Sequence, residues 1–149
     1  MSKEWKVYLS GEIHSDWREQ IIAGSNDVIL PVVFSSAVTD HESSDMCGVN
    51  ILGEEQQAFW QDQKASGINR IRTSVSIKDA DIVVVRFGPK YKQWNAAFDA
   101  GYAAALGKTL ITLHDEELNH ALKEVDGAAN AVARTPEQVV EIFKYVMLN

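Results

Sequence analysis

The sequence predicts a flavodoxin-like, doubly wound α/β fold, with a five-stranded, mainly parallel sheet and helices on both faces. Short apolar runs rich in β-branched residues alternate with longer helical patterns, which is the order that parallel strands joined by crossover helices produce. Some of these runs are almost continuously apolar, as is typical of strands buried on both faces. At 149 residues, the chain has the length of one ordinary domain, so we expect a single domain over 1–149.

The first half of the chain predicts two strands and two helices. Ser15 is the expected N-cap of the first helix, and Pro31 lies within the second strand, where an edge or a bulge would tolerate it. Residues 35–53 are polar and rich in turn formers, so we expect a long functional loop there, such as a lid. The strands are expected at 5–10 and 28–34, and the helices at 16–23 and 54–64.

In the second half, residues 81–87 form the clearest strand of the sequence, and the segment 68–78 fits a helix about as well as a strand. Thr135 and Pro136 are typical of the N-cap and first position of a final helix. Between these segments we expect a helix at 95–106, a strand at 109–114, a helix at 116–124 and a short strand at 128–133.

Composition narrows the classes of partner and the compartment. A formal net charge of -7 argues against binding long nucleic acid, which needs a basic face, but a few local donors can hold a small nucleotide. The single cysteine, Cys47, cannot form an internal disulfide and fits a reducing cytosol. We expect no signal peptide, because the first residues lack an apolar stretch, and no apolar run approaches membrane-spanning length. We therefore expect a cytoplasmic protein with no membrane partner.

Ligands of doubly wound sheets bind outside the carboxyl ends of the strands. The loops after Ser10, Phe34 and Phe87 are expected at that edge. Asp99 falls early in the helix that follows the last of these loops, where the helix macrodipole and free N–H groups favour a charged carboxylate. Such a carboxylate suits a nucleophile. An acid in the first turn of a helix is also common without any function, and both interpretations stay open.

The turn after the first strand concentrates functional side chains. Gly11 would let the backbone approach a ligand, while His14, Asp16 and Arg18 offer a base, an acid and an anion-binding guanidinium. The alternative is an N-cap followed by a solvated helix face.

One possible metal site is the polar segment Asp40-His41-Glu42, together with Asp45 and Cys47. Its spacing matches no standard zinc or calcium loop, so a polar loop is the expected structure. No strand leads into a Gly-x-Gly-x-x-Gly turn, and no Walker sequence occurs. We predict no metal and no cofactor.

Three segments resemble a known family. Asp81-Ile82-Val83-Val84-Val85 and the stretch Phe98-Asp99-Ala100-Gly101-Tyr102-Ala103, which continues to Gly107-Lys108, resemble the core signature of nucleoside 2-deoxyribosyltransferases, and Val7-Tyr8-Leu9-Ser10-Gly11 resembles the end of their first strand. Over its whole length the chain is most similar to the YtoQ family, which belongs to this superfamily.

The resemblance implies a double displacement at the anomeric carbon of a deoxyribose, in which a carboxylate attacks and the base leaves. Asp99 falls on the nucleophile position, where the transferases have a glutamate, and Tyr8 falls on a tyrosine that orients it. Gln93 stands where the transferases have an acid, six residues before the nucleophile. His14 or Asp16 would then have to supply the proton to the leaving base.

Three interpretations follow for the function. The first is an enzyme that cleaves or transfers the N-glycosidic bond of a nucleoside or nucleotide. The second is a nucleotide-binding or sensing domain without catalysis, and the third is an assembly surface, since such domains often complete their sites in a homo-oligomer. Arg18 and Lys92 are the expected phosphate ligands, and Trp17 or Trp94 would stack on a base. The expected substrate-binding residues are Gly11, Trp17, Arg18, Lys92, Gln93, Trp94 and Asn95.

Overall fold

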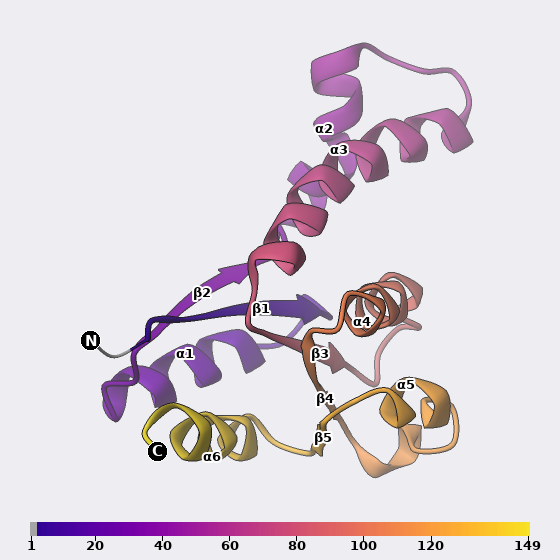
Figure 1. Cartoon of the computed structure of the whole chain (residues 1–149). Coiled ribbons are helices and arrows are strands. Elements are labelled where there is room, and N and C mark those ends of the chain that lie inside the picture. The colour runs from indigo at the N-terminus through magenta and orange to yellow at the C-terminus, as the bar shows by residue number, and fades with distance from the viewer. Residues whose placement is uncertain (1–2) are drawn as a thin grey trace.

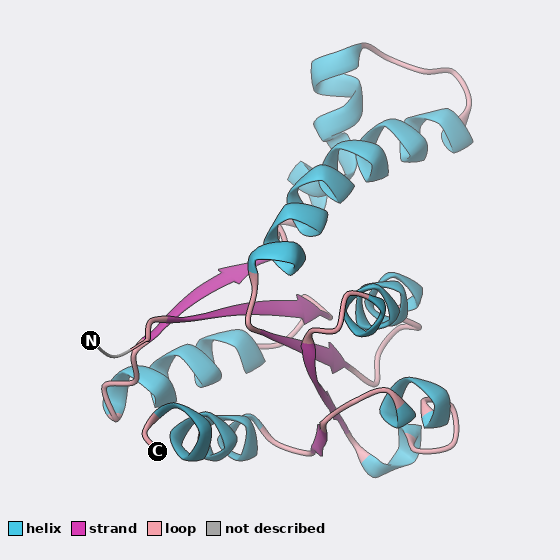
Figure 2. Ribbon diagram, viewed as in Figure 1, coloured by secondary structure: helices cyan, strands magenta, loops and turns pink. Residues whose placement is uncertain are grey.

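The computed structural model describes residues 3–149 and shows one parallel sheet between two layers of helices (Figure 1 and Figure 2). The strand order is β2-β1-β3-β4-β5, and every neighbouring pair is parallel. This order is the flavodoxin-like one, so the predicted fold class is confirmed. The strands are β1 (Trp5–Gly11), β2 (Val32–Ser36), β3 (Ile82–Phe87), β4 (Thr109–His114) and β5 (Ala131–Ala133).

The two faces of the sheet build two separate cores, because successive strand residues point to opposite sides. On one face Val7 and Leu9 pack with helices α1 (Trp17–Asp27) and α6 (Pro136–Met147). On the other face Tyr8 packs with helix α4 (Trp94–Ala105). Residues of β3 belong to both cores, which explains the continuous apolar run that identified this strand.

Two helices form an arm that extends away from the sheet (Figure 1). They are α2 (His41–Leu52) and α3 (Ala58–Asp79), and we call this pair the arm. They cross closely at Gly48, where a Cβ atom would lie 2.4 Å from the backbone nitrogen of Ala65. The Asn69 amide donates to the Ser44 carbonyl at 3.0 Å and fastens the pair. Only the last turns of α3 enter the body of the protein, where Ile77 is fully buried.

The arm corrects two predictions. The segment 35–53 is not a long loop, because residues 41–52 form α2; these residues pack on α3 instead of on the main core, so their helical pattern is weak. The predicted helix at 54–64 starts only at Ala58, and it continues through the ambiguous segment 68–78 as one helix of 22 residues. Helical backbone continues through Gly67.

The second strand begins later than predicted. Val28 and Ile29 form a turn in which Ile29 has φ 53°, and β2 starts at Val32. Pro31 stands just before the strand, and its carbonyl accepts a hydrogen bond from the Trp5 amide at 2.8 Å. Its missing N–H therefore interrupts no ladder within β2.

The remaining differences lie at the ends of elements. Asp16, not Ser15, is the N-cap of α1, and α1 runs to Asp27. The helix predicted at 116–124 is divided into a 3₁₀ turn, Glu116–Leu118, and a short helix α5 (Lys123–Gly127). The final helix begins as predicted, with the Thr135 hydroxyl accepting from the Gln138 amide. Between residues 3 and 149 no helix is both long and apolar enough to cross a membrane.

Candidate functional site

The carboxylate of Asp99 meets the end of β1 at the carboxyl edge of the sheet. Its Oδ2 accepts a hydrogen bond from Ser10 Oγ at 2.8 Å, and its Oδ1 accepts one from Arg70 Nη2 at 3.0 Å. Asp99 is only 8% exposed. The hydroxyl donor and the cationic donor supply the partners that a buried charge needs.

The position of Asp99 in its helix differs from the predicted one. Helix α4 begins at Trp94, with Gln93 as N-cap, so Asp99 is the sixth residue and lies in the second turn. The free N–H groups of a helix start lie too far back to solvate it. Arg70 and Ser10 take their place as donors.

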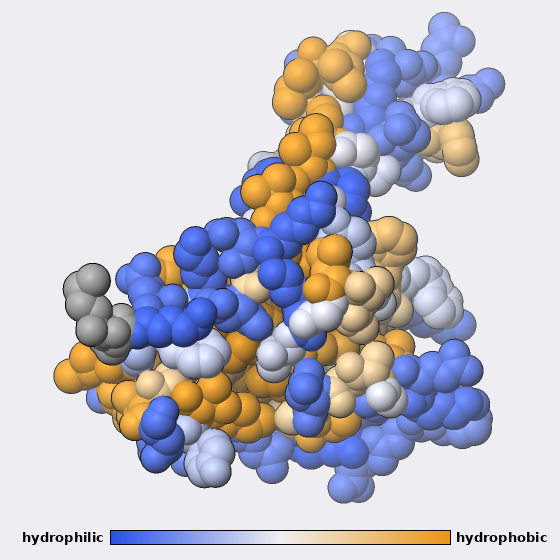
Figure 3. All heavy atoms as spheres, viewed as in Figure 1, coloured by the Kyte–Doolittle hydropathy of each residue, from blue (hydrophilic) through white to orange (hydrophobic). Residues whose placement is uncertain are grey.

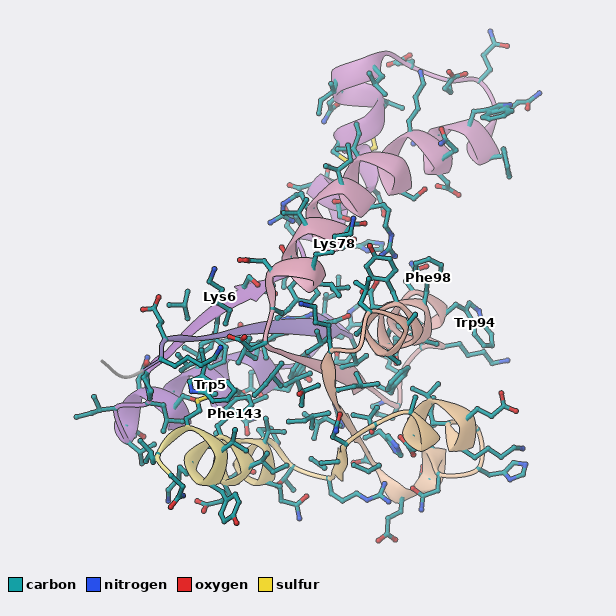
Figure 4. The ribbon with its side chains drawn as sticks, viewed as in Figure 1. Trp5, Lys6, Lys78, Trp94, Phe98 and Phe143 are labelled. Atoms are coloured by element: carbon teal, nitrogen blue, oxygen red, sulfur yellow. The ribbon has the colours of Figure 1, made fainter. Side chains whose placement is uncertain are left out.

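Arg70 reaches Asp99 from the middle of α3. Its guanidinium carbon lies 4.3 Å from the centroid of the Phe98 ring and 5.8 Å from that of Tyr102. Phe98 stands on the side of α4 that is nearer the arm (Figure 4). Nη1 of Arg70 is buried and has no hydrogen-bond partner among residues 3–149. The guanidinium is therefore fixed by stacking and by one ion pair, and it keeps an unused donor beside the carboxylate.

Tyr8 lies on the same face of β1 as Ser10 and is 1% exposed. Burial, and secondly the negative charge of Asp99, raise the pKa of Tyr8 to about 12. Its hydroxyl has no partner within the described chain. Tyr8, Ser10, Arg70 and Asp99 thus form a cluster, which we call the Asp99 site.

Trp17 and Arg18 hold the turn after β1 and face inward. The Trp17 indole is 2% exposed and donates to the Glu12 carbonyl at 2.8 Å. Its burial in the core corrects the prediction that it stacks on a base. The Arg18 guanidinium is also buried, which lowers its pKa, and it donates to the carbonyls of Leu9, Gly11 and Glu12. A phosphate would have to draw it away from all three.

Gly11 is needed for chain packing at this turn. Its φ is +118°, and a Cβ atom would lie 2.1 Å from the Arg86 carbonyl oxygen. Only glycine therefore fits where β1 passes β3. This contact is to the neighbouring strand, whereas the sequence suggested close approach to a ligand.

The turns after β1 and β3 meet beyond the carboxyl ends of these two strands. The rings of His14 and Tyr91 are 4.9 Å apart. Gln93 closes the second turn, because its side chain accepts from the Gly88 amide at 2.9 Å and donates to the Tyr91 carbonyl. Asp16 is exposed and accepts from the Gln20 side chain at 2.7 Å.

Three more predicted residues lie on the outer surface at the start of α4. Trp94 is 72% exposed (Figure 4), and the Lys92 ammonium lies 5.6 Å from its ring centroid. Asn95 is exposed beside them. This surface is available to a ligand, unlike Trp17 and Arg18.

The polar segment at 40–47 lies on the arm. His41 and Asp45 pair at 3.1 Å across one helical turn, and Cys47 faces α3. Within the part of the chain that the structure describes, no three His, Cys, Asp or Glu side chains gather so that they could hold a metal ion.

Sequence reasoning missed three polar residues near the site: Ser10, Glu12 and Arg70. Glu12 is 6% exposed, and its carboxylate accepts from the His14 amide and the Ser15 hydroxyl. Strand alternation was an available signal for Ser10, since it shares a face with Tyr8. Arg70 gave no signal, because its segment was ambiguous and its partner is 29 residues away.

Comparison with known proteins identifies a family. Residues 8–147 match the family model described as nucleoside 2-deoxyribosyltransferase YtoQ. A protein of Bacillus subtilis (strain 168), described as uncharacterized protein YtoQ, is 45% identical over 143 residues, covering 96% of this chain and 97% of its own length.

Two solved structures share the fold at low identity. The 2-deoxyribosyltransferase from Bacillus psychrosaccharolyticus has a TM-score of 0.53 and 18% identity, with 91% of this chain and 90% of that one covered. A conserved protein from Enterococcus faecalis V583 has a TM-score of 0.64 and 14% identity, with coverage of 97% and 99%. The family match and the 45% identical relative together show that the chain belongs to the nucleoside 2-deoxyribosyltransferase YtoQ family.

Proposed function

We propose that the protein cleaves or transfers the N-glycosidic bond of a nucleoside or nucleotide, with Asp99 as the nucleophile. The observation that carries this proposal is the buried Asp99 carboxylate at the carboxyl edge of the sheet, held by Ser10 and Arg70. Ligands of this fold class bind at that edge. Membership in the family supports the same class of substrate.

The chemistry is a double displacement. An oxygen of Asp99 forms a bond to the anomeric carbon while the bond from that carbon to the base breaks, and the base leaves with the electron pair and takes up a proton. Water or a second base then attacks the same carbon and releases the carboxylate. The anionic carboxylate stabilises the oxocarbenium-like charge of both transition states.

The neighbours of Asp99 position it for this attack. The Ser10 hydroxyl and Arg70 each fix one carboxylate oxygen, so the side chain cannot rotate freely, and near-attack geometry depends on such fixation. Tyr8, whose pKa is raised by burial, lies near enough for the charge of Asp99 to raise it further. His14, exposed beside Tyr91, is the proposed proton donor to the leaving base, with Asp16 as the alternative.

The surface of Trp94 and Lys92 is the proposed substrate-binding face. An exposed indole can stack on a base, and the ammonium beside it can bind a phosphate. Asn95 and Gln93 flank this surface. Substitution Trp94→Ala is expected to raise KM more than it lowers kcat, because this residue touches the substrate away from the reacting carbon.

Base release is the direct test. The protein is incubated with deoxynucleosides, ribonucleosides and their monophosphates, and free base is followed by chromatography. Asp99→Asn keeps the size of the side chain but removes the nucleophile, so release should stop. Asp27→Asn makes the same change of charge at an exposed position on α1 and should leave release unchanged. Release that persists in Asp99→Asn would exclude Asp99 as the nucleophile.

A nucleotide-binding or sensing domain is the second candidate function. The observation that favours it is Gln93, whose amide is bound to two backbone groups in place of the acid that the transferases carry. This candidate predicts binding without base release. Titration calorimetry with the same compounds distinguishes the two, because a sensor gives a stable heat of binding and unchanged ligand.

A further inference from the structure

The Asp99 carboxylate is covered by its own partners. Its side chain is only 11% exposed, and both oxygens already accept a hydrogen bond, Oδ2 from Ser10 and Oδ1 from Arg70. A nucleophile has to bring an oxygen to within about 3–3.5 Å of the carbon that it attacks. With so little of the carboxylate accessible, one of the two donors has to move before the proposed reaction can begin.

Arg70 is held less firmly than Ser10. Ser10 is 1% exposed and lies in β1, where its register partner in β3 is Val85. The Arg70 side chain is 35% exposed, and apart from its ion pair it is held by the ring faces of Phe98 and Tyr102. Figure 3 shows the arm standing clear of the body along most of its length, and α3 packs mainly against α2. Arg70 is therefore the donor that can leave.

The contact between Arg70 and Asp99 uses only part of the guanidinium. Nη2 donates to Oδ1 at 3.0 Å, whereas Nη1 is buried and has no partner within residues 3–149. A buried donor without a partner is unfavourable. A phosphate binds arginine through two parallel hydrogen bonds, and a phosphate monoester carries about 1.5 to 2 negative charges at neutral pH. Such a group can therefore compete with the Asp99 carboxylate for Arg70.

The surroundings of the Asp99 site also favour an anion. Burial and then the charge of Asp99 raise the pKa of Tyr8, and the charges of three arginines act against them. Three positive charges therefore lie near this site, although the chain as a whole carries a formal net charge of -7. They are Arg18, Arg70 and Arg72, of which Arg18 is already bound to backbone carbonyls and Arg72 is exposed on α3.

We propose that Arg70 is a gate, which covers the Asp99 nucleophile in the free protein and is drawn off it by the phosphate of a nucleoside monophosphate. The inference rests on the proposed function and narrows its substrate class to phosphorylated nucleosides. The phosphate shifts the equilibrium because it binds only the state in which Arg70 has left the carboxylate. Ser10 still holds Oδ2 in that state, so the carboxylate keeps its direction while Oδ1 becomes accessible.

Inorganic phosphate is the probe that tests the gate without any reaction. Titration calorimetry compares the unaltered protein with Asp99→Asn, in which the carboxylate no longer competes for Arg70. Phosphate should bind Asp99→Asn about 5- to 30-fold more tightly, the factor that corresponds to an ion pair of about 1–2 kcal/mol. In an Arg70→Gln background the substitution Asp99→Asn should give no such gain, which separates the gate from simple repulsion between two anions. A variant that fails to fold cannot show a gain in affinity.

Base release tests the substrate class. Each nucleoside is compared with its 5'-monophosphate by kcat/KM, and the unaltered protein should prefer the monophosphate by about 10-fold or more. Arg70→Gln should raise release from the nucleoside, because the carboxylate is uncovered, and lower release from the monophosphate. A merely structural role of Arg70 would not move the two substrates in opposite directions. Lys6→Gln removes the same charge at the amino edge of the sheet, where Lys6 is 51% exposed, and should change neither rate.

The two tests separate the gate from the proposed function. Equal release from nucleosides and monophosphates, or a phosphate affinity that Asp99→Asn leaves unchanged, would overturn the gate and leave the proposed function standing. Absence of base release from every compound, together with the gain in phosphate affinity, would support Arg70 as an anion-controlled contact and overturn the proposed function. A preference for monophosphates that is lost in Lys92→Gln but kept in Arg70→Gln would assign the phosphate to the surface beside Trp94 and overturn the gate.

Discussion

The ion pair between Arg70 and Asp99 can be measured by a double-mutant cycle with Arg70→Gln and Asp99→Asn. The two charges are 3.0 Å apart, with side chains 35% and 11% exposed. At that distance unit charges attract by about 1.4 kcal/mol in water and about 5.5 kcal/mol at an effective dielectric constant of about 20. Desolvation and side-chain ordering oppose this attraction. Since Phe98 already holds the guanidinium, we expect a coupling free energy of about 1–2 kcal/mol.

The assay is urea unfolding of the four proteins of the cycle at neutral pH, followed by circular dichroism. A control cycle uses Lys144 and Glu141, whose charges are 3.2 Å apart but whose side chains are 39% and 69% exposed. Water screens that pair, so its coupling should stay below about 0.5 kcal/mol. A coupling at Arg70 and Asp99 no larger than the control would show that Arg70 does not hold the carboxylate.

Two further predictions concern residues beside the site. Burial holds the pKa of Tyr8 at about 12, above the ordinary value of 10.0, so folding favours the protonated phenol. That contribution is fully present below pH 10 and is lost between pH 10 and 12, at about 1.4 kcal/mol per pKa unit. Urea midpoints across this range should fall less steeply in Tyr8→Phe than in the control Tyr91→Phe. Gly11→Ala should lower the free energy of unfolding by about 3 kcal/mol or more, because its methyl group would overlap the Arg86 carbonyl. Gly107→Ala, also at positive φ but with nothing within 4 Å, should cost only about 1 kcal/mol; equal losses would refute the role of the strand contact.

Prediction from the sequence worked where local pattern and burial agree. Strand β3 is buried on both faces, so its apolar run identified it directly. Helix α6 carries its own start signal in Thr135 and Pro136, and the hydroxyl caps the helix as expected. The arm was missed because α2 and α3 bury little against the sheet. Some of their apolar residues face the other helix and others face solvent. This spread weakens the periodic pattern that identifies a helix.

The candidate site also has one part that the sequence predicts and one part that only the packing of distant segments creates. The sequence by itself determined that a carboxylate, Asp99, stands in the helix after the third strand, and its motif pointed to a nucleophile. Only the tertiary structure decided which groups hold that carboxylate. Ser10 is 89 residues away in the chain and Arg70 is 29 residues away. Spacing along the chain cannot specify such contacts, because they exist only once β1, α3 and α4 have packed together.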